Sequence, residues 1–155
     1  MKYLISACLV GENVRYDGQN CLHTQLKSLL KTGQAIMICP EVSGGLSTPR
    51  AAAEIVGGDG HAVLKGQAKV IDTQGNDVTQ AFIQGAEKTL KLAQHHQVTH
   101  VILKANSPSC GSTWIYDGSF SGNKIHGKGV TTALLEQYGF KVMTEDEFLN
   151  PLKSL

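Results

Sequence analysis

The sequence lacks three features that would each indicate a class of protein. No two of its four cysteines are separated by two residues, so neither a zinc-ribbon pair nor a thioredoxin-type dithiol has its usual spacing. No apolar stretch approaches the ~20 residues of a transmembrane helix. The apolar stretch before Cys8 is shorter than the ~7–15 residues of a signal-peptide core. We therefore expect a cytoplasmic protein that makes no use of a membrane.

Charge of either sign is also sparse. Charged residues make up 17% of the chain, and 14 Lys and Arg nearly balance 13 Asp and Glu. The net charge of +1 gives no strong nucleic-acid surface and no attraction to an anionic membrane, so any anion must be recognised locally. A chain of 155 residues has the length of one domain that buries roughly two-thirds of its unfolded surface. We expect a single domain over residues 1–155, as a monomer or a homodimer.

Short apolar runs alternate with helical patterns along the chain, which is typical of an α/β fold. The apolar runs predict buried strands at residues 3–10, 35–38, 98–103 and 140–143. Apolar residues at helical spacing predict helices at 22–30, 78–93 and 130–138, with a final short helix after Thr144. We expect an open, mostly parallel Rossmann-like sheet flanked by helices.

Other stretches predict local features of this fold. Residues 62–64 and 68–71 alternate around a Lys-Gly-Gln turn, which predicts a small β-hairpin insertion. The stretches 41–60 and 118–129 are rich in glycine and serine and predict long loops, the first of them functional. Asp77-Val-Thr-Gln80 and Thr144-Glu-Asp-Glu147 have the form of helix capping boxes.

Three cysteines follow the apolar runs closely. Cys8 lies at the end of the first predicted strand, Cys39 directly after the second, and Cys110 in the loop after the strand at 98–103. Ligands of open parallel sheets bind beyond the carboxyl ends of the strands, so we expect these thiols on one rim. Cys21, at the start of the first helix, can reach that rim or pack elsewhere.

The residues themselves leave several interpretations open. Each cysteine could be a small buried hydrophobe. Three thiolates could instead bind zinc, copper or an iron–sulfur cluster. A closed zinc site needs four ligands, so Cys21 or a histidine would have to join, giving a storage or regulatory module without turnover. Cys110 could also be a nucleophile at a helix N-terminus, where the pKa of a thiol is lowered.

An ordered set of short motifs covers nearly the whole chain. The chain resembles the thiouracil desulfidase family in Ser6-Ala-Cys-Leu9 with Gly11, Tyr16-Asp-Gly18, Cys39-Pro-Glu41, Gly44-Gly-Leu46, Thr48-Pro-Arg50, Asp77-Val-Thr79, Ser107-Pro-Ser-Cys-Gly111, Tyr116-Asp-Gly118 and the residues from Gly127 to Thr131. Each motif alone is short, but their order along one chain is specific.

The resemblance implies a 4Fe-4S cluster held by Cys8, Cys39 and Cys110, with one open iron. It further implies removal of sulfur from thiolated uracil bases or nucleotides, such as 2- or 4-thiouracil and 4-thiouridine monophosphate. In the implied mechanism the thiocarbonyl sulfur binds the open iron, water attacks the ring carbon, and sulfur leaves as hydrosulfide without net electron transfer. A free pyrimidine base or nucleotide is expected as the partner, because the chain has no broad basic surface for RNA.

Candidate chemical roles fall on residues beside the cysteines. Glu41 could activate the water or move its proton, or it could simply pair with Arg50. Ser107 and Ser109 could hydrogen-bond the substrate ring, the leaving sulfur or the cluster, although loop serines often satisfy their own turn. Lys104 could neutralise the charge of the cluster or of a phosphate.

Further candidates are weaker. Ser43, Gly44 and Gly45 could offer free amides to a phosphate. Asp17 could orient the substrate, but the formation of its own turn is favoured. Trp114 and Tyr116 could stack on a pyrimidine. The three remaining candidates lie near a helix end, where capping roles are usual: His95, His96 and His100.

Overall fold

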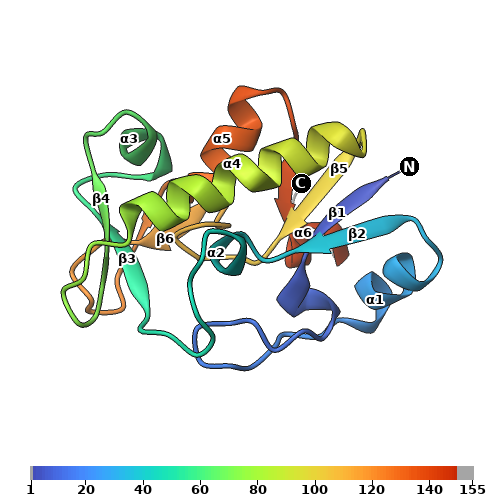
Figure 1. The fold of residues 1–155 in the computed structure, drawn as a ribbon, viewed down its shortest axis with the longest axis horizontal. Helices are drawn as coiled ribbons and strands as arrows, with labels where there is room; N and C mark the ends of the chain where they lie inside the picture. Colours follow the sequence, from blue (N-terminus) through green and yellow to red (C-terminus); the bar gives the residue numbers. More distant parts are fainter. Residues whose placement is uncertain (1, 150–155) are drawn as a thin grey trace.

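The computed structural model describes residues 2–149 and has an α/β fold (Figure 1). Its main sheet contains four parallel strands in the order β2-β1-β5-β8. Their bounds are Tyr3–Ser6 for β1, Ala35–Ile38 for β2, His100–Leu103 for β5 and Val142–Thr144 for β8. The predicted open parallel sheet flanked by helices is confirmed.

The strand order reverses beside β1. The chain passes from β1 to β2 on one side, and later returns to place β5 on the other side of β1, so that Leu4 pairs with both Ile36 and Val101. Such a reversal opens a crevice beyond the carboxyl ends of the strands. The segments that follow β1, β2 and β5 are therefore brought to one edge.

Side chains alternate between the two faces of the sheet, and each face carries its own helices. One face packs against α4 (Thr79–His95) and α5 (Val130–Gln137) through Leu4, Val101, Leu103, Leu90 and Leu135. The other face packs against α1 (Thr24–Lys31) and α6 (Glu145–Leu149) through Ile5, Ile102, Leu26 and Phe148. Burial on both faces explains why the strand sequences are almost uniformly apolar.

The first strand is shorter than predicted. Residues 7–10 form a 3₁₀ turn, η1 (Ala7–Val10), which ends at Gly11 with a φ of 101°. All four side chains of this turn are buried, so their hydrophobicity does not distinguish the turn from a strand. Cys8 consequently lies beyond β1 rather than within it.

A second structural region lies beside the main sheet and is bridged to it by α4 (Figure 1). It contains the antiparallel pair of β3 (Ala53–Val56) and β4 (Lys69–Asp72), and the antiparallel pair of β6 (Trp114–Tyr116) and β7 (Lys124–His126). The predicted hairpin is present, but the expectation that 62–64 forms its first strand is wrong. Those residues belong to α3 (Gly60–Leu64), because Asp59 accepts the Ala62 amide and starts a helix.

The two loop predictions need the same correction. The stretch 41–60 contains β3, and the stretch 118–129 contains β7. The capping box at the last helix is confirmed: the Glu147 amide donates to Thr144 Oγ1 at 3.1 Å, and the Thr144 amide donates to Glu147 Oε1 at 3.2 Å. At α4, Asp77 instead accepts the Thr79 amide at 2.9 Å, and no capping side chain is found at the helix itself.

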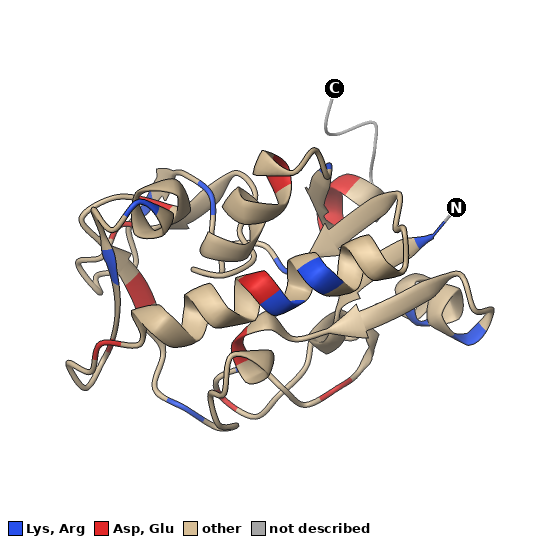
Figure 2. Ribbon diagram, turned by 45° about the horizontal axis from the view of Figure 1, so that its top comes forward, with Lys and Arg blue, Asp and Glu red and all other residues tan. Residues whose placement is uncertain are grey.

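Within residues 2–149, none of the helices combines the length and apolarity that crossing a membrane requires. Lys and Arg are scattered among Asp and Glu over the whole molecule (Figure 2).

Candidate metal centre and its cavity

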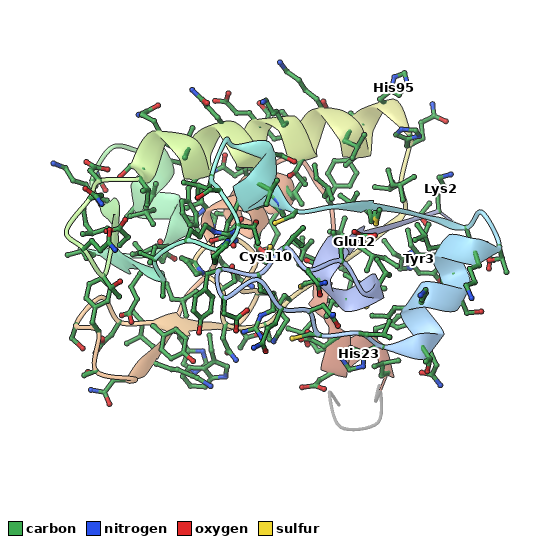
Figure 3. The ribbon with its side chains drawn as sticks, turned by 60° about the horizontal axis from the view of Figure 1, so that its bottom comes forward. Lys2, Tyr3, Glu12, His23, His95 and Cys110 are labelled. Carbon is green, nitrogen blue, oxygen red and sulfur yellow. The ribbon has the colours of Figure 1, made fainter. Side chains whose placement is uncertain are left out.

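A cavity of about 440 Å³ opens at the carboxyl ends of β1, β5 and β2. Cys8 from η1, Cys39 at the start of α2 (Pro40–Ser43) and Cys110 from the loop after β5 all line it. Figure 3 shows Cys110 near the middle of the molecule, whereas His23 and His95 lie at its periphery. The predicted convergence of three thiols on one rim is thus present in the fold, and Cys21 is not part of the lining.

Cys110 is fixed by a turn that is attached to α5. Within the turn, Ser107 Oγ accepts the amides of Ser109 and Cys110 at 3.0 and 3.1 Å. From α5, the Val130 amide donates to the Pro108 carbonyl at 2.8 Å, and the Thr132 hydroxyl donates to the Cys110 carbonyl at 2.9 Å. The first turn of α5 would otherwise leave its backbone amides unpaired, so the attached loop supplies them with acceptors.

Ser6 supplies a contact that the sequence interpretation missed. Its buried hydroxyl oxygen accepts the Lys104 amide at 3.0 Å, and its own proton is directed to Cys110 Sγ at 3.8 Å. Because the oxygen already serves as the acceptor for the amide, the sulfur is the acceptor for the hydroxyl proton. No local pattern reveals this contact, since β1 and β5 meet only in the folded sheet.

Cys39 is placed by the packing of α2 on α4. A Cβ on Gly44 would lie 1.9 Å from the Ala81 carbonyl oxygen, and a Cβ on Gly85 would lie 2.0 Å from the Pro40 carbonyl oxygen. The two backbones therefore touch directly. The Cys39 thiol also donates to the Val14 carbonyl at 3.9 Å, which joins α2 to the loop after η1.

Burial controls the protonation of the three thiols. Loss of hydration raises the pKa of Cys8 to about 12, with smaller contributions from the negative charge of Cys21 and Cys39. Burial also raises the pKa of Cys39 and that of Cys110, and for Cys110 the next cause is the Glu41 carboxylate. This contradicts the interpretation of Cys110 as a nucleophile with a lowered pKa. Thiols of this kind become thiolates when a metal centre binds them.

Glu41 lines the cavity and forms an ion pair with Arg50. Arg50 Nη2 lies 2.9 Å from Glu41 Oε2, and the two side chains are 7% and 20% exposed. Glu41 is thus a residue of the cavity lining whose carboxylate is paired with Arg50. Arg50 Nε is buried and has no hydrogen-bond partner among residues 2–149.

Lys104 also lines the cavity and is held by a buried carboxylate. Its Nζ lies 3.6 Å from Oε2 of Glu145, whose side chain is only 6% exposed. Oε1 of Glu145 accepts the Ala105 amide at 3.1 Å. A buried carboxylate is costly unless it is paired, and the ammonium of Lys104 is the cation that pairs with Glu145. This ion pair holds the Lys104 side chain where its charge acts on Cys8.

Several predicted site residues are not brought to the cavity. Ser109 is buried and its hydroxyl bonds Thr131 Oγ1 at 2.7 Å. Asp17 accepts the Gln19 amide at 3.0 Å and so shapes its own turn. None of Ser109, Asp17 or the 43–45 segment belongs to the lining.

The idea that the 43–45 segment offers free amides is wrong. The Ser43, Gly44 and Gly45 amides donate to the carbonyls of Cys39, Pro40 and Val42 within and just after α2. The glycine at position 44 serves packing instead, because a side chain there would collide with the backbone of α4.

The cavity continues into the second region of the fold. Tyr116 and Glu54 line it there, and Glu54 Oε1 accepts the Gly118 and Phe120 amides at 3.0 and 3.2 Å. Trp114 stacks on His126 at 3.8 Å and is 42% exposed, outside the lining. The histidines at 95, 96 and 100 also lie outside it. Arg15 and Asn106 add polar groups that the sequence interpretation did not select.

Comparison with known proteins agrees with this geometry. The family model described as 2-thiouracil desulfurase matches residues 3–147. The chain belongs to the 2-thiouracil desulfurase family. YbbK of Bacillus subtilis (strain 168), described as an uncharacterized protein, is 50% identical over 144 residues, covering 93% of this chain and 95% of that protein. A solved structure of TudS, described as a [4Fe-4S]-dependent thiouracil desulfidase, is 41% identical, with a TM-score of 0.84 over 99% of both chains.

The desulfurase family resemblance inferred from the motifs is confirmed, and the donor set is compatible with a cluster. Within residues 2–149, no three His, Cys, Asp or Glu side chains lie close enough together to hold a single metal ion. Neither Cys21 nor a histidine lines the described cavity, so the four-ligand zinc site considered from the sequence is not assembled there. Three thiols spread around about 440 Å³ suit a larger, soft group such as an iron–sulfur cluster.

Proposed function

We propose that this protein is a [4Fe-4S]-dependent desulfidase, which removes sulfur from thiolated uracil bases or nucleotides and releases it as hydrosulfide. The observation that supports this most strongly is that three thiols, the buried Cys8 and Cys110 and the partly buried Cys39, line one cavity together with Glu41. The description of TudS as a [4Fe-4S]-dependent thiouracil desulfidase supports the same chemistry.

Cys8, Cys39 and Cys110 would hold the cluster. When bound, a cluster with three cysteine ligands supplies an open iron that acts as a Lewis acid toward a thiocarbonyl sulfur. The Ser6 hydroxyl bonds Cys110 Sγ, and Lys104 lies close enough to Cys8 to lower its pKa against the effect of burial. Both groups place positive charge or a hydrogen-bond donor beside the thiolates, which stabilises their deprotonated form.

Glu41 would accept a proton from the attacking water. The water oxygen bonds to the ring carbon that carries sulfur, the carbon–sulfur bond breaks, and sulfur leaves as hydrosulfide. The second proton of the water leaves on the sulfur, so the thiocarbonyl and water become the carbonyl of the oxo-product, hydrosulfide and the proton held by Glu41, with no net electron transfer. Glu41 suits the role of base because its carboxylate lines the cavity and is directed by Arg50.

Ser107 is the more suitable of the two candidate serines. It lines the cavity, and its oxygen already accepts two amides, so its proton is free to be donated toward a bound ring or a leaving sulfur. Tyr116 offers an aromatic face for the pyrimidine. Arg15 and Lys104 offer cations for a nucleotide phosphate, which favours a small substrate over RNA in a molecule whose charges are scattered.

The test is anaerobic reconstitution with iron and sulfide, followed by incubation with 4-thiouridine monophosphate or 2-thiouracil. A brown protein with about four irons per chain should release one hydrosulfide per oxo-product formed, without an added reductant. A colourless protein that binds zinc and releases no sulfide from either compound would contradict the proposal. That result would favour the alternative in which the protein is a zinc-binding storage or regulatory module without turnover.

A further inference from the structure

Arg50 does not itself line the cavity, but its buried side chain bonds residues that do. Its side chain is only 7% exposed, and Nη2 lies 2.9 Å from Glu41 Oε2. Oε1 of Glu41 accepts no hydrogen bond from residues 2–149. One carboxylate oxygen is therefore committed to Arg50, while the other has no hydrogen-bond partner among these residues.

The same guanidinium bonds three separate segments of the chain, two of which carry the cavity-lining residues Val14 and Glu41. Nη1 donates to the carbonyls of Val14 and Ser47, both at 3.1 Å. The Arg50 amide donates to the Tyr16 carbonyl at 2.7 Å. Val14 and Tyr16 themselves line the cavity. Arg50 thus fixes the loop after η1 against α2, the element that carries both Cys39 and Glu41.

We propose that Arg50 is the positioning residue for Glu41, acting through the carboxylate rather than on the substrate. This inference rests on the proposed function, in which Glu41 accepts the proton of water. The N–H donors of a planar guanidinium point in fixed directions, so Arg50 can bind one carboxylate and two carbonyls at once. The single ammonium of lysine cannot reproduce that arrangement of donors. Without Arg50, the half-buried Glu41 loses the group that holds its orientation, and a misplaced base costs rate rather than substrate affinity.

The test is a double-mutant cycle on the anaerobically reconstituted enzyme, comparing Arg50→Gln, Glu41→Gln and the double variant. Glu41→Gln should lower kcat about 10²-fold or more. Arg50→Gln should lower kcat by about tenfold to 10²-fold at nearly unchanged KM. The double variant should be no slower than Glu41→Gln alone, because Arg50 has nothing left to position. A further loss of tenfold or more in the double variant would overturn the inference.

Two further variants separate positioning from structural damage. Lys88→Gln is the matched control, because Lys88 Nζ also donates to α2, at the Ser43 carbonyl, but does not contact Glu41. Its kcat and iron content should equal those of the wild type. If Arg50→Gln fails to fold, Arg50→Lys takes its place in the same cycle with the same two outcomes. A wild type that releases no sulfide would instead overturn the proposed function, and this role with it.

Discussion

Gly85 of α4 lies against Pro40 of α2 so closely that a Cβ on Gly85 would stand 2.0 Å from the Pro40 carbonyl oxygen. The reciprocal contact places Gly44, the residue directly after α2, on the Ala81 carbonyl of α4. These contacts explain how a long helix with no residue on the cavity determines the position of Cys39 and Glu41. A backbone contact cannot be relieved by the movement of a flexible side chain, so it fixes α2 firmly.

Gly85→Ala should therefore destabilise the protein and weaken cluster binding. In an exposed helix interior, alanine is more stabilising than glycine by about 0.8–1 kcal/mol. Here the added methyl meets backbone, and overpacking of this kind costs about 1–3 kcal/mol. Chemical denaturation of the metal-free variant should show lower stability than the wild type. Gln84→Ala, at the neighbouring exposed position, should show no such loss.

Removal of the Ser6 hydroxyl should change the electronic properties of the bound cluster. Ser6→Ala removes the donor to Cys110 Sγ, and hydrogen bonds to cysteine sulfurs raise the reduction potential of a cluster. The potential of the variant, measured by anaerobic spectroelectrochemistry, should be more negative than that of the wild type. Ser112→Ala is the matched control, because this serine is equally buried but donates to Glu147. An equal shift in both variants would show that the Ser6 contact is not specific.

The stability of the metal-free protein should fall in alkaline solution. The pKa of Cys8 is raised from 9.0 to about 12, so the folded state favours the neutral thiol. The corresponding stability is fully present below pH 9 and is lost as the pH rises toward 12, because the unfolded chain ionises first. The loss from this thiol amounts to about 1.4 kcal/mol per pH unit. Denaturant unfolding between pH 8 and 10.5 should show a smaller decline for Cys8→Ala; an equal decline would exclude Cys8 as its source.

The sequence predicted the thiol-bearing rim because its signals are local. Buried parallel strands are short apolar runs, and the runs at residues 3–10 and 35–38 are followed at once by Gly11 and by Cys39-Pro40. The order of these runs then places Cys8, Cys39 and Cys110 on one edge by topology alone. Residues 7–10 escaped this reasoning because a buried 3₁₀ turn and a buried strand are equally apolar.

The contacts that refine the site depend on tertiary structure. Ser6 meets Cys110 only because β1 and β5 are neighbours, and Arg50 reaches Val14 only across the loop after η1. The 43–45 segment was misinterpreted for the opposite reason. Its small residues look like a phosphate loop, whereas Gly44 provides space for α4 and the amides are already bonded.

The central claim, that three thiols and not four hold the metal centre, is tested most directly by one comparison. Iron and acid-labile sulfide per chain are measured after anaerobic reconstitution of Cys8→Ser, Cys21→Ser, Cys39→Ser and Cys110→Ser. Only Cys21 lies outside the cavity lining, so Cys21→Ser should retain the wild-type content of about four irons and its sulfide release, while the other three lose both. Loss of the cluster in Cys21→Ser, or its retention in any of the other three variants, would contradict the account.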